Sequence, residues 1–148
     1  MYFIQPPPGV QWDAPYSYVK RATISAPGQK ATLTINVDSD QGVWIRRHRI
    51  TAFYVMGGNL ARMVPTTVAQ DRLEVSVRRG NGVLNMDNPM DVHDWNDIPD
   101  DFLFPGWTLP PATVLTVDVG HVFVGAANFG VPIWLTLSLS GFRIGRGA

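Results

Sequence analysis

The sequence predicts an all-β protein, an antiparallel two-sheet β-sandwich with jelly-roll-like or Greek-key-like connections. Apolar and polar residues alternate with a period of two in at least four segments, which places the apolar side chains on one face of a strand. No segment combines a helix cap with an apolar stripe of 3.6-residue period, so we expect little helix. Gly, Pro and Asn residues, which are common in turns, separate the alternating segments.

The composition narrows the class of protein. The 148 residues predict one β-sandwich domain, and only 16% of them are charged. Typical domains have about a quarter charged residues, so the low value favours a surface that is covered by permanent contacts. Lys and Arg together number 12, as do Asp and Glu, so no net charge attracts nucleic acid or an anionic membrane. We expect neither as a partner.

The sequence has no cysteine, which excludes disulfides, thiolate zinc sites and cysteine nucleophiles. Its first residues lack the basic and apolar regions of a signal peptide, and no run approaches the roughly 20 apolar residues of a membrane helix. We therefore expect a soluble protein that is made in a cytosol.

Residues 1–16 are predicted to form an extended, proline-rich arm, and residues 17–148 the β-sandwich domain. The run Pro6-Pro7-Pro8 favours polyproline II, which cannot join a sheet centrally. The arm also carries large apolar side chains, which suit a docked segment better than a free tail. It either crosses its own domain or reaches a neighbouring subunit, and its candidate assembly contacts are Phe3, Ile4, Trp12 and Tyr16.

The first half of the domain is predicted to hold three strands. Residues 18–26 and 30–38 resemble the two arms of a hairpin around Pro27-Gly28. Residues 43–56 form one long strand, basic in its first half and apolar on both faces in its second half. Such a second half is expected to cross the centre of the sandwich, where both faces are covered.

The second half of the domain is predicted to hold four more strands, so we expect about seven or eight strands in the two sheets. Residues 72–78 alternate, and the turn signal Arg79-Gly80-Asn81-Gly82 leads into residues 83–85. Residues 114–119 and 133–144 are expected to pair as one long antiparallel unit, joined by the small-residue loop 125–130. The core predicted from all segments is Leu33, Ile35, Val37, Phe53, Val55, Leu73, Val75, Val77, Leu115, Val117, Val119, Ile133, Leu135, Leu137 and Leu139.

Residues 87–101 contain half of the acidic residues and are predicted to form an irregular loop, because aspartates cap turns with their own side chains. Two other interpretations remain open. A metal site would use oxygen and imidazole ligands, here Asp91, His93, Asp94 and Asp97. A glycoside hydrolase would use two of the carboxylates, with Trp95 as a sugar platform. Neither interpretation has a diagnostic spacing, so we expect no metal ligand and no cofactor.

No sequence motif supports catalysis. A phosphate-binding glycine loop, a nucleophile elbow and a His-Glu zinc motif are all missing. The three histidines, His48, His93 and His121, lie in unrelated segments. We therefore expect no catalytic residue and no enzyme activity.

The C-terminal third of the chain resembles small virion proteins of tailed bacteriophages. An aromatic-proline segment, Phe104-Pro105, precedes the turn Leu109-Pro110-Pro111 and the alternating strand 114–119. The small-residue loop Ala126-Ala127-Asn128 follows, and the last strand ends in Leu139-Ser140-Gly141-Phe142-Arg143. The shared motifs are structural and include no catalytic residue.

This resemblance implies a jelly-roll-like β-sandwich that works as a non-enzymatic subunit of a virion. The first expectation is a capsid-decorating protein that contacts copies of itself, with a trimer favoured, and the major capsid protein. The alternatives are a neck, tail or baseplate component, or a β-sandwich that binds carbohydrate or a receptor through Trp95 and Trp107. A small hydrolase that uses the acidic loop is a further alternative from another class.

Overall fold

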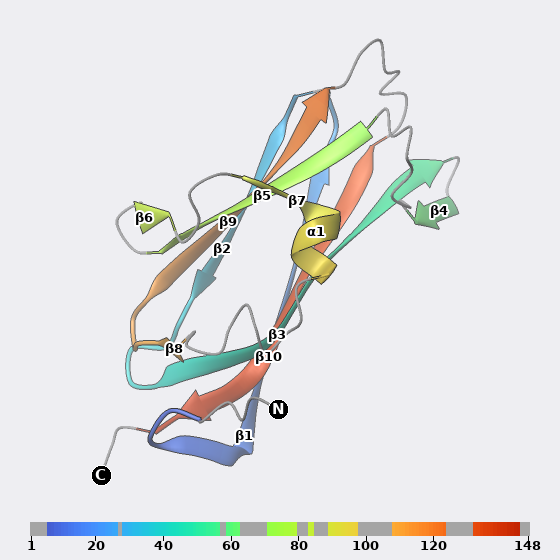
Figure 1. The fold of residues 1–148 in the computed structure, drawn as a ribbon. Coiled ribbons are helices and arrows are strands. Elements are labelled where there is room, and N and C mark those ends of the chain that lie inside the picture. The colour runs from blue at the N-terminus through green and yellow to red at the C-terminus, as the bar shows by residue number, and fades with distance from the viewer. Residues whose placement is uncertain are drawn as a thin grey trace.

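The computed structural model describes residues 6–26, 28–56, 59–62, 71–79, 83–84, 89–97, 108–123 and 132–145. Two antiparallel sheets face each other across a common core, as in a β-sandwich (Figure 1). Sheet A has the strand order β1-β10-β3-β4, and β8 also pairs with β3. Sheet B has the order β2-β9-β5-β6, and β7 also pairs with β5. The prediction of an all-β protein with two antiparallel sheets is confirmed.

The elements have the following bounds. Sheet A contains β1 (Val10–Ile24), β3 (Gly42–Met56), β4 (Asn59–Arg62), β8 (Thr108–Leu109) and β10 (Ile133–Ile144). Sheet B contains β2 (Lys30–Asn36), β5 (Asp71–Arg79), β6 (Val83–Leu84), β7 (Met90–Asp91) and β9 (Val114–Phe123). Within the described residues the helix α1 (Val92–Asp97) is short, and none is long and apolar enough to span a membrane.

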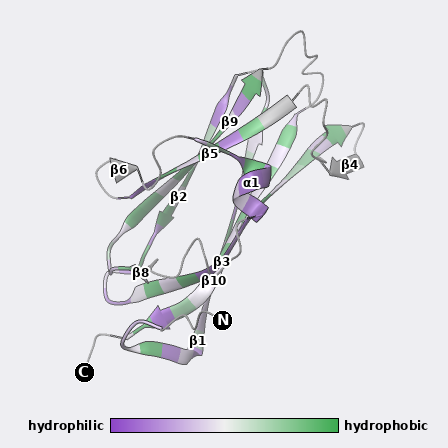
Figure 2. Cartoon of the chain, viewed as in Figure 1, coloured by the Kyte–Doolittle hydropathy of each residue, from purple (hydrophilic) through white to green (hydrophobic). Residues whose placement is uncertain are grey.

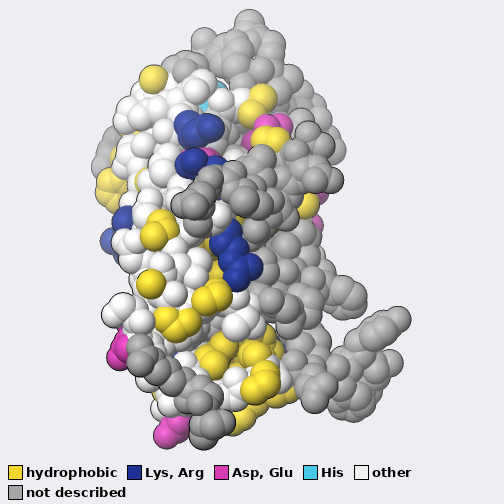
Figure 3. All heavy atoms as spheres, turned by 90° about the vertical axis from the view of Figure 1, so that its left-hand side faces the viewer, with side chains coloured by type: hydrophobic (Ala, Val, Ile, Leu, Met, Phe, Trp, Pro, Cys, Tyr) yellow, Lys and Arg dark blue, Asp and Glu magenta, His cyan; other side chains and the backbone are white. Residues whose placement is uncertain are grey.

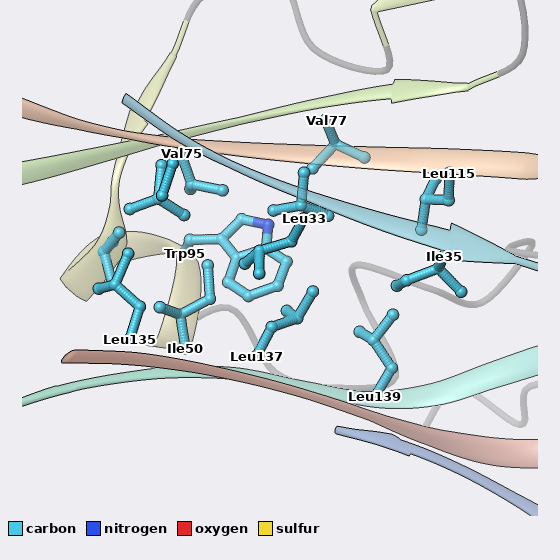
Figure 4. Close-up of a cluster of buried hydrophobic side chains, with 14 of the residues drawn as sticks. Leu33, Ile35, Ile50, Val75, Val77, Trp95, Leu115, Leu135, Leu137 and Leu139 are labelled. Atoms are coloured by element: carbon cyan, nitrogen blue, oxygen red, sulfur yellow. The ribbon is translucent and has the colours of Figure 1, made fainter. Parts of the chain in front are cut away.

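The core lies between the sheets. Hydrophobic and hydrophilic residues alternate along the strands that line it (Figure 2). Leu135, Leu137 and Leu139 of β10 face sheet B, and aliphatic side chains of β2, β5 and β9 meet them (Figure 4). Burying one such side chain stabilises the fold by about 1.5–3 kcal/mol. The predicted core residues are buried as expected, apart from Phe53 and Val55.

A bulge in β3 explains why the prediction for Phe53 and Val55 is wrong. Ser140 pairs with Arg47 while Gly141 pairs with Ile45, so Arg46 is an extra residue in the ladder. One extra residue reverses the face to which all later side chains point. Val43 and Ile45 point into the core before the bulge, whereas His48, Ile50 and Ala52 do so after it. Phe53 and Val55 are therefore only half-buried, on the outer face of sheet A.

Two of the predicted strand pairings are wrong. The strands β9 and β10 do not pair with each other, because β9 lies in sheet B and β10 in sheet A. The strands β1 and β2 likewise belong to opposite sheets, so the turn at Gly28 joins two layers and is not a hairpin. Alternation determines which face of a strand is buried, but it does not determine the neighbouring strand.

The predicted arm and the predicted domain overlap in β1. Strand β1 begins at Val10, which pairs with Ile144, so residues 10–16 belong to sheet A. Their pairing is interrupted between Gln11 and Pro15, and residues 12–14 project as a bulge. A bulge and a proline are both tolerated here because β1 is an edge strand. Residues 1–5 lie outside the described residues.

The prediction of an irregular loop over residues 87–101 is wrong for residues 90–97. The carboxylate of Asp91 accepts a hydrogen bond from the backbone N–H of His93 (2.8 Å), as an N-cap residue does at the start of a helix. Val92 and Trp95 are buried on one side of α1, so tertiary packing stabilises this short helix. Residues 85–88 and 98–101 lie outside the described part of the chain.

Candidate functional site

The bulge in β1 places a large aromatic side chain at the surface. Trp12 is 58% exposed, and its ring meets Phe142 of β10 edge-to-face at a centroid distance of 5.0 Å. Trp12 also meets Trp44 of β3 at 5.9 Å, with an interplanar angle of 82°. We call Trp12, Trp44 and Phe142 the Trp12 cluster. It lies at the end of sheet A where β10 ends and β1 begins.

Trp44 is the buried member of the Trp12 cluster. It precedes the bulge in β3 and therefore points away from the core, yet it is 0% exposed. Trp12 meets it on one side, and the guanidinium of Arg46 lies 4.6 Å from its ring centroid. This cation–π contact and the edge-to-face contact hold Trp44 in place. Its indole N–H has no hydrogen-bond partner within the described residues.

Gly141 allows the close approach of β3 and β10 beside the Trp12 cluster. A Cβ atom added to Gly141 would overlap the backbone carbonyl oxygen of Trp44. Only glycine fits at such a contact, because every other residue carries a Cβ atom. The glycine in the Leu-x-Gly-aromatic-basic end of the chain therefore has a structural reason.

Tyr16 lies on the opposite side of β1 and packs against the core. Burial raises the pKa of its hydroxyl, as do the nearby Tyr18 and Asp38, whereas Arg143 lowers it. The guanidinium of Arg143 lies 5.9 Å from the Tyr16 ring and donates a hydrogen bond to Asp38 (2.6 Å). Tyr16 therefore takes part in contacts within its own chain.

The four predicted assembly contacts therefore differ in whether a partner could reach them. Trp12 is exposed and available to a partner, and Tyr16 faces inward. Phe3 and Ile4 lie outside the described residues. Sequence reasoning did not find Trp44 and Phe142, because they become neighbours only through the pairing of β3 with β10, which are far apart in the sequence.

The residues proposed for a metal or sugar site do not form one. The side chains of His93 and Asp97 approach each other at 3.4 Å on the exposed side of α1, while Asp91 caps the helix. Among the described residues, no group of three or more His, Cys, Asp or Glu side chains is placed to hold a metal ion.

The proposal that Trp95 forms a sugar platform is wrong, because Trp95 is only 1% exposed. Its ring lies between the two sheets (Figure 4). It packs against the ring of His48 at a centroid distance of 4.5 Å. A sugar could not stack on a ring that is enclosed on both faces by core side chains. Trp107, its proposed companion, lies outside the described residues.

Two of the histidines make structural contacts with the backbone. The Nε2 atom of His48 lies 2.9 Å from the carbonyl oxygen of Trp95. A carbonyl can only accept a hydrogen bond, so this nitrogen carries the proton. The Nδ1 atom of His121 accepts a hydrogen bond from the N–H of Gly28 (3.1 Å), near the turn between the sheets. Each of these histidines ties a loop or helix to a strand.

The fold and the Trp12 cluster define a β-sandwich protein with an exposed aromatic group at one end of sheet A. Hydrophobic side chains also gather in the lower half of the side shown in Figure 3, at the height where β10 ends in Figure 1. Comparison with known proteins finds no family model, no curated protein and no solved structure that matches the chain.

Proposed function

We propose that this protein is a non-enzymatic structural subunit of a bacteriophage virion, with capsid decoration as its role. In this role it contacts copies of itself, as a trimer in the simplest case, and the major capsid protein. The observation that carries the proposal is the way in which the strands are paired. It acts in the virion after synthesis in the host cytoplasm.

The strand pairs are nested, which supports a jelly-roll fold. The first strand β1 pairs with the last strand β10, and β2 pairs with β9 inside that pair. Further inside, β3 pairs with β8 and β5 pairs with β6. A jelly roll is a β-sandwich of two Greek keys that is common in viral capsid proteins and in lectins. This nested order arises when one long antiparallel hairpin is rolled up so that its successive strand pairs fall into two sheets.

The Trp12 cluster supports a role in assembly. Tryptophan is enriched at protein interfaces, and single buried tryptophans often contribute much of the binding energy. Trp12 is 58% exposed, yet its position is fixed by Trp44 and Phe142. A fixed side chain loses little conformational entropy when a partner covers it. We therefore assign the end of sheet A around Trp12 to the contact with another virion protein.

The test is the presence of the protein in purified particles. Mass spectrometry of gradient-purified virions is expected to detect the chain in a fixed stoichiometry to the major capsid protein. Antibody labelling in electron microscopy then gives its position. Label over the capsid supports decoration, label at the neck or tail supports the alternative virion components, and particles without the chain contradict the proposal.

Two tryptophan variants test the contact surface. The change Trp12→Ala is expected to reduce binding to particles that lack the protein, because it removes the exposed member of the Trp12 cluster. The change Trp134→Ala removes another exposed tryptophan, 46% exposed, from the far end of β10, and it is expected to leave binding intact. Equal binding by both variants would exclude the Trp12 cluster as the contact.

A further inference from the structure

Among the described residues that follow the bulge in β1, the outer face of sheet A carries arginines and no acidic side chain. After the bulge in β3, Arg47 and Arg49 point outward and are exposed, and Arg21 of β1 is exposed on the same face. We call these three residues the arginine face. The outward positions around them are filled by hydroxyl and apolar side chains, namely Ser17, Val19, Thr23, Trp134, Thr136, Ser138, Ser140, Thr51 and Phe53.

The strand register places the arginine face on one continuous surface. Arg49 is aligned with Ser138 of β10, and Ser138 is aligned with Val19 of β1. Arg21 is aligned with Thr136 in a neighbouring row. Within the described part of the chain, the side chains of Arg21, Arg47 and Arg49 make no ion pair and no hydrogen bond. The positive charge of this face is therefore not compensated by its own sheet.

The same chain carries a complementary acidic surface on α1. Val92 and Trp95 anchor one side of the helix in the core, while Asp94 and Asp97 are exposed on the opposite side. The sequence contains no Lys or Arg between Arg79 and Arg143, and the basic side chain beside these carboxylates on α1 is His93, which lies 3.4 Å from Asp97. The chain is neutral overall because its 12 Lys and Arg residues balance its 12 Asp and Glu residues, although the arginine face and α1 each carry charges of one sign.

The spacing of the charges matches on the two surfaces. Arg47 and Arg49 are two residues apart on one face of a strand, which separates them by about 6.6 Å. Asp94 and Asp97 are three residues apart on a helix, which places their Cβ atoms about 5–6 Å apart. A guanidinium can hold a carboxylate through two parallel hydrogen bonds, so two such pairs can form side by side. The helix is held at the edge of β3 in its own chain, so its carboxylates are presented outward.

We propose that α1 of one copy of this chain docks on the arginine face of a second copy. The contact uses Asp94 and Asp97 on one side and Arg47 and Arg49 on the other. It is a head-to-tail contact between different surfaces, and such contacts generate closed rings when the rotation between subunits permits closure. This inference rests on the proposed function, because that function requires contacts between copies of the chain, and the inference specifies the residues of one such contact.

The contact depends on exposed charges and is therefore sensitive to salt. Charge interactions extend over roughly 30 Å at about 0.01 M salt but only about 3 Å at about 1 M. Sedimentation velocity of the full chain is expected to show oligomers at the lower salt concentration and their dissociation at the higher one. A chain that stays monomeric in low salt at high protein concentration would overturn the proposal.

Charge reversal tests the two surfaces separately. One variant combines Arg47→Glu with Arg49→Glu, and the other combines Asp94→Lys with Asp97→Lys. Each alone carries like charges on both surfaces, so its dissociation constant for self-association is expected to rise at least about tenfold. An equimolar mixture is expected to associate again, because the acidic face of one variant fits the basic helix of the other. Failure of the mixture to associate would overturn the proposal.

Control variants test whether association depends on these particular charges. The change Lys30→Glu reverses an exposed charge on sheet B and is expected to leave association unchanged, in contrast to Arg49→Glu alone. If a reversed variant does not fold, as judged by circular dichroism, the neutral pair Arg47→Gln and Arg49→Gln replaces it, with the same expected loss. Binding of a single-stranded oligonucleotide to the arginine face, without recovery in the mixture, would instead assign the face to nucleic acid and overturn the proposal.

The outcomes of this experiment and of the particle experiment are independent. Association through charges is measured on the isolated chain, whereas the proposed function is measured on particles. A chain that is present in virions but shows no charge-dependent association retains the proposed function and loses this contact. A chain that associates through these charges but is absent from virions retains the contact and loses the proposed function.

Discussion

Asn96 closes an open part of the edge of β3 by forming two hydrogen bonds with the backbone of Ile50. Its side-chain oxygen accepts from the N–H of Ile50 (2.8 Å), and its side-chain nitrogen donates to the Ile50 carbonyl (2.6 Å). Strand β8 pairs with one end of β3 and β4 with the other. Between them, the amide of Asn96 makes the contacts of a single residue in a neighbouring strand.

The first prediction is that Asn96→Ala lowers the free energy of unfolding by about 1–3 kcal/mol, because both backbone groups of Ile50 lose their partner. Urea unfolding followed by tryptophan fluorescence measures the change. The change His93→Ala, on the exposed side of the same helix, is the control and is expected to alter stability by less than about 0.5 kcal/mol. Similar losses for the two variants would show that the Asn96 contact does not stabilise the edge.

The second prediction concerns two glycines in the strands. We expect Gly141→Ala to destabilise the protein by about 1–3 kcal/mol or more, since the new Cβ would overlap the carbonyl oxygen of Trp44 and separate β10 from β3. Gly120→Ala in β9 is the matched control, because a Cβ there meets no atom within 4 Å. Thermal unfolding of both variants gives the comparison. A Gly141→Ala protein as stable as the control would disprove the close approach.

The third prediction tests the alternation in β10. The change Leu137→Asp is expected to abolish folding, because Leu137 is 0% exposed and an unpaired buried carboxylate costs several kcal/mol. The change Ser138→Asp places the carboxylate on the outer face beside Arg49, where it is expected to be tolerated. Circular dichroism and size-exclusion chromatography distinguish the outcomes. Equal behaviour of the two variants would mean that the strand does not have one buried face.

The fourth prediction is a loss of stability at alkaline pH that depends on Tyr16. The folded protein raises the pKa of Tyr16, chiefly through burial, so it holds the phenol proton more tightly than the unfolded chain does. This contribution is fully present below the unfolded pKa of about 10 and is lost as the pH rises through the raised pKa. Urea unfolding at several pH values is expected to show a smaller alkaline loss in Tyr16→Phe. An unchanged pH dependence in this variant would contradict the prediction.

The sequence contains enough information to predict the strands and most of the core, because the side-chain period follows directly from strand geometry. Alternation in β10 correctly places Ile133, Leu135, Leu137 and Leu139 inside. It does not reveal that β9 and β10 belong to opposite sheets, since their pairing depends on the whole chain. It also misses the single extra residue at Arg46, which reverses the faces of Phe53 and Val55.

The candidate site is only partly predictable, because it too depends on strand pairing and on bulges that the alternation does not reveal. The exposure of Trp12 depends on a bulge that forms where β1 meets the end of β10, between residues far apart in the sequence. Tyr16 follows that bulge and points the other way. The helical turn at α1 escapes prediction because six residues are too few to show a 3.6-residue period. Its stability comes from Trp95, whose burial becomes visible only in the fold.

The nested strand order has a consequence for the folding of the protein during its translation. The central partner of both β1 and β3 is β10, which is the last of the described strands in chain order. The pairing of β1 and β3 with β10 in sheet A therefore cannot form until β10 has been translated, and β1 stays unpaired until then. Pairings between distant parts of a chain form slowly, which leaves unpaired edges open to aggregation in the meantime. A growing chain of this kind is expected to need protection by chaperones until β10 emerges from the ribosome.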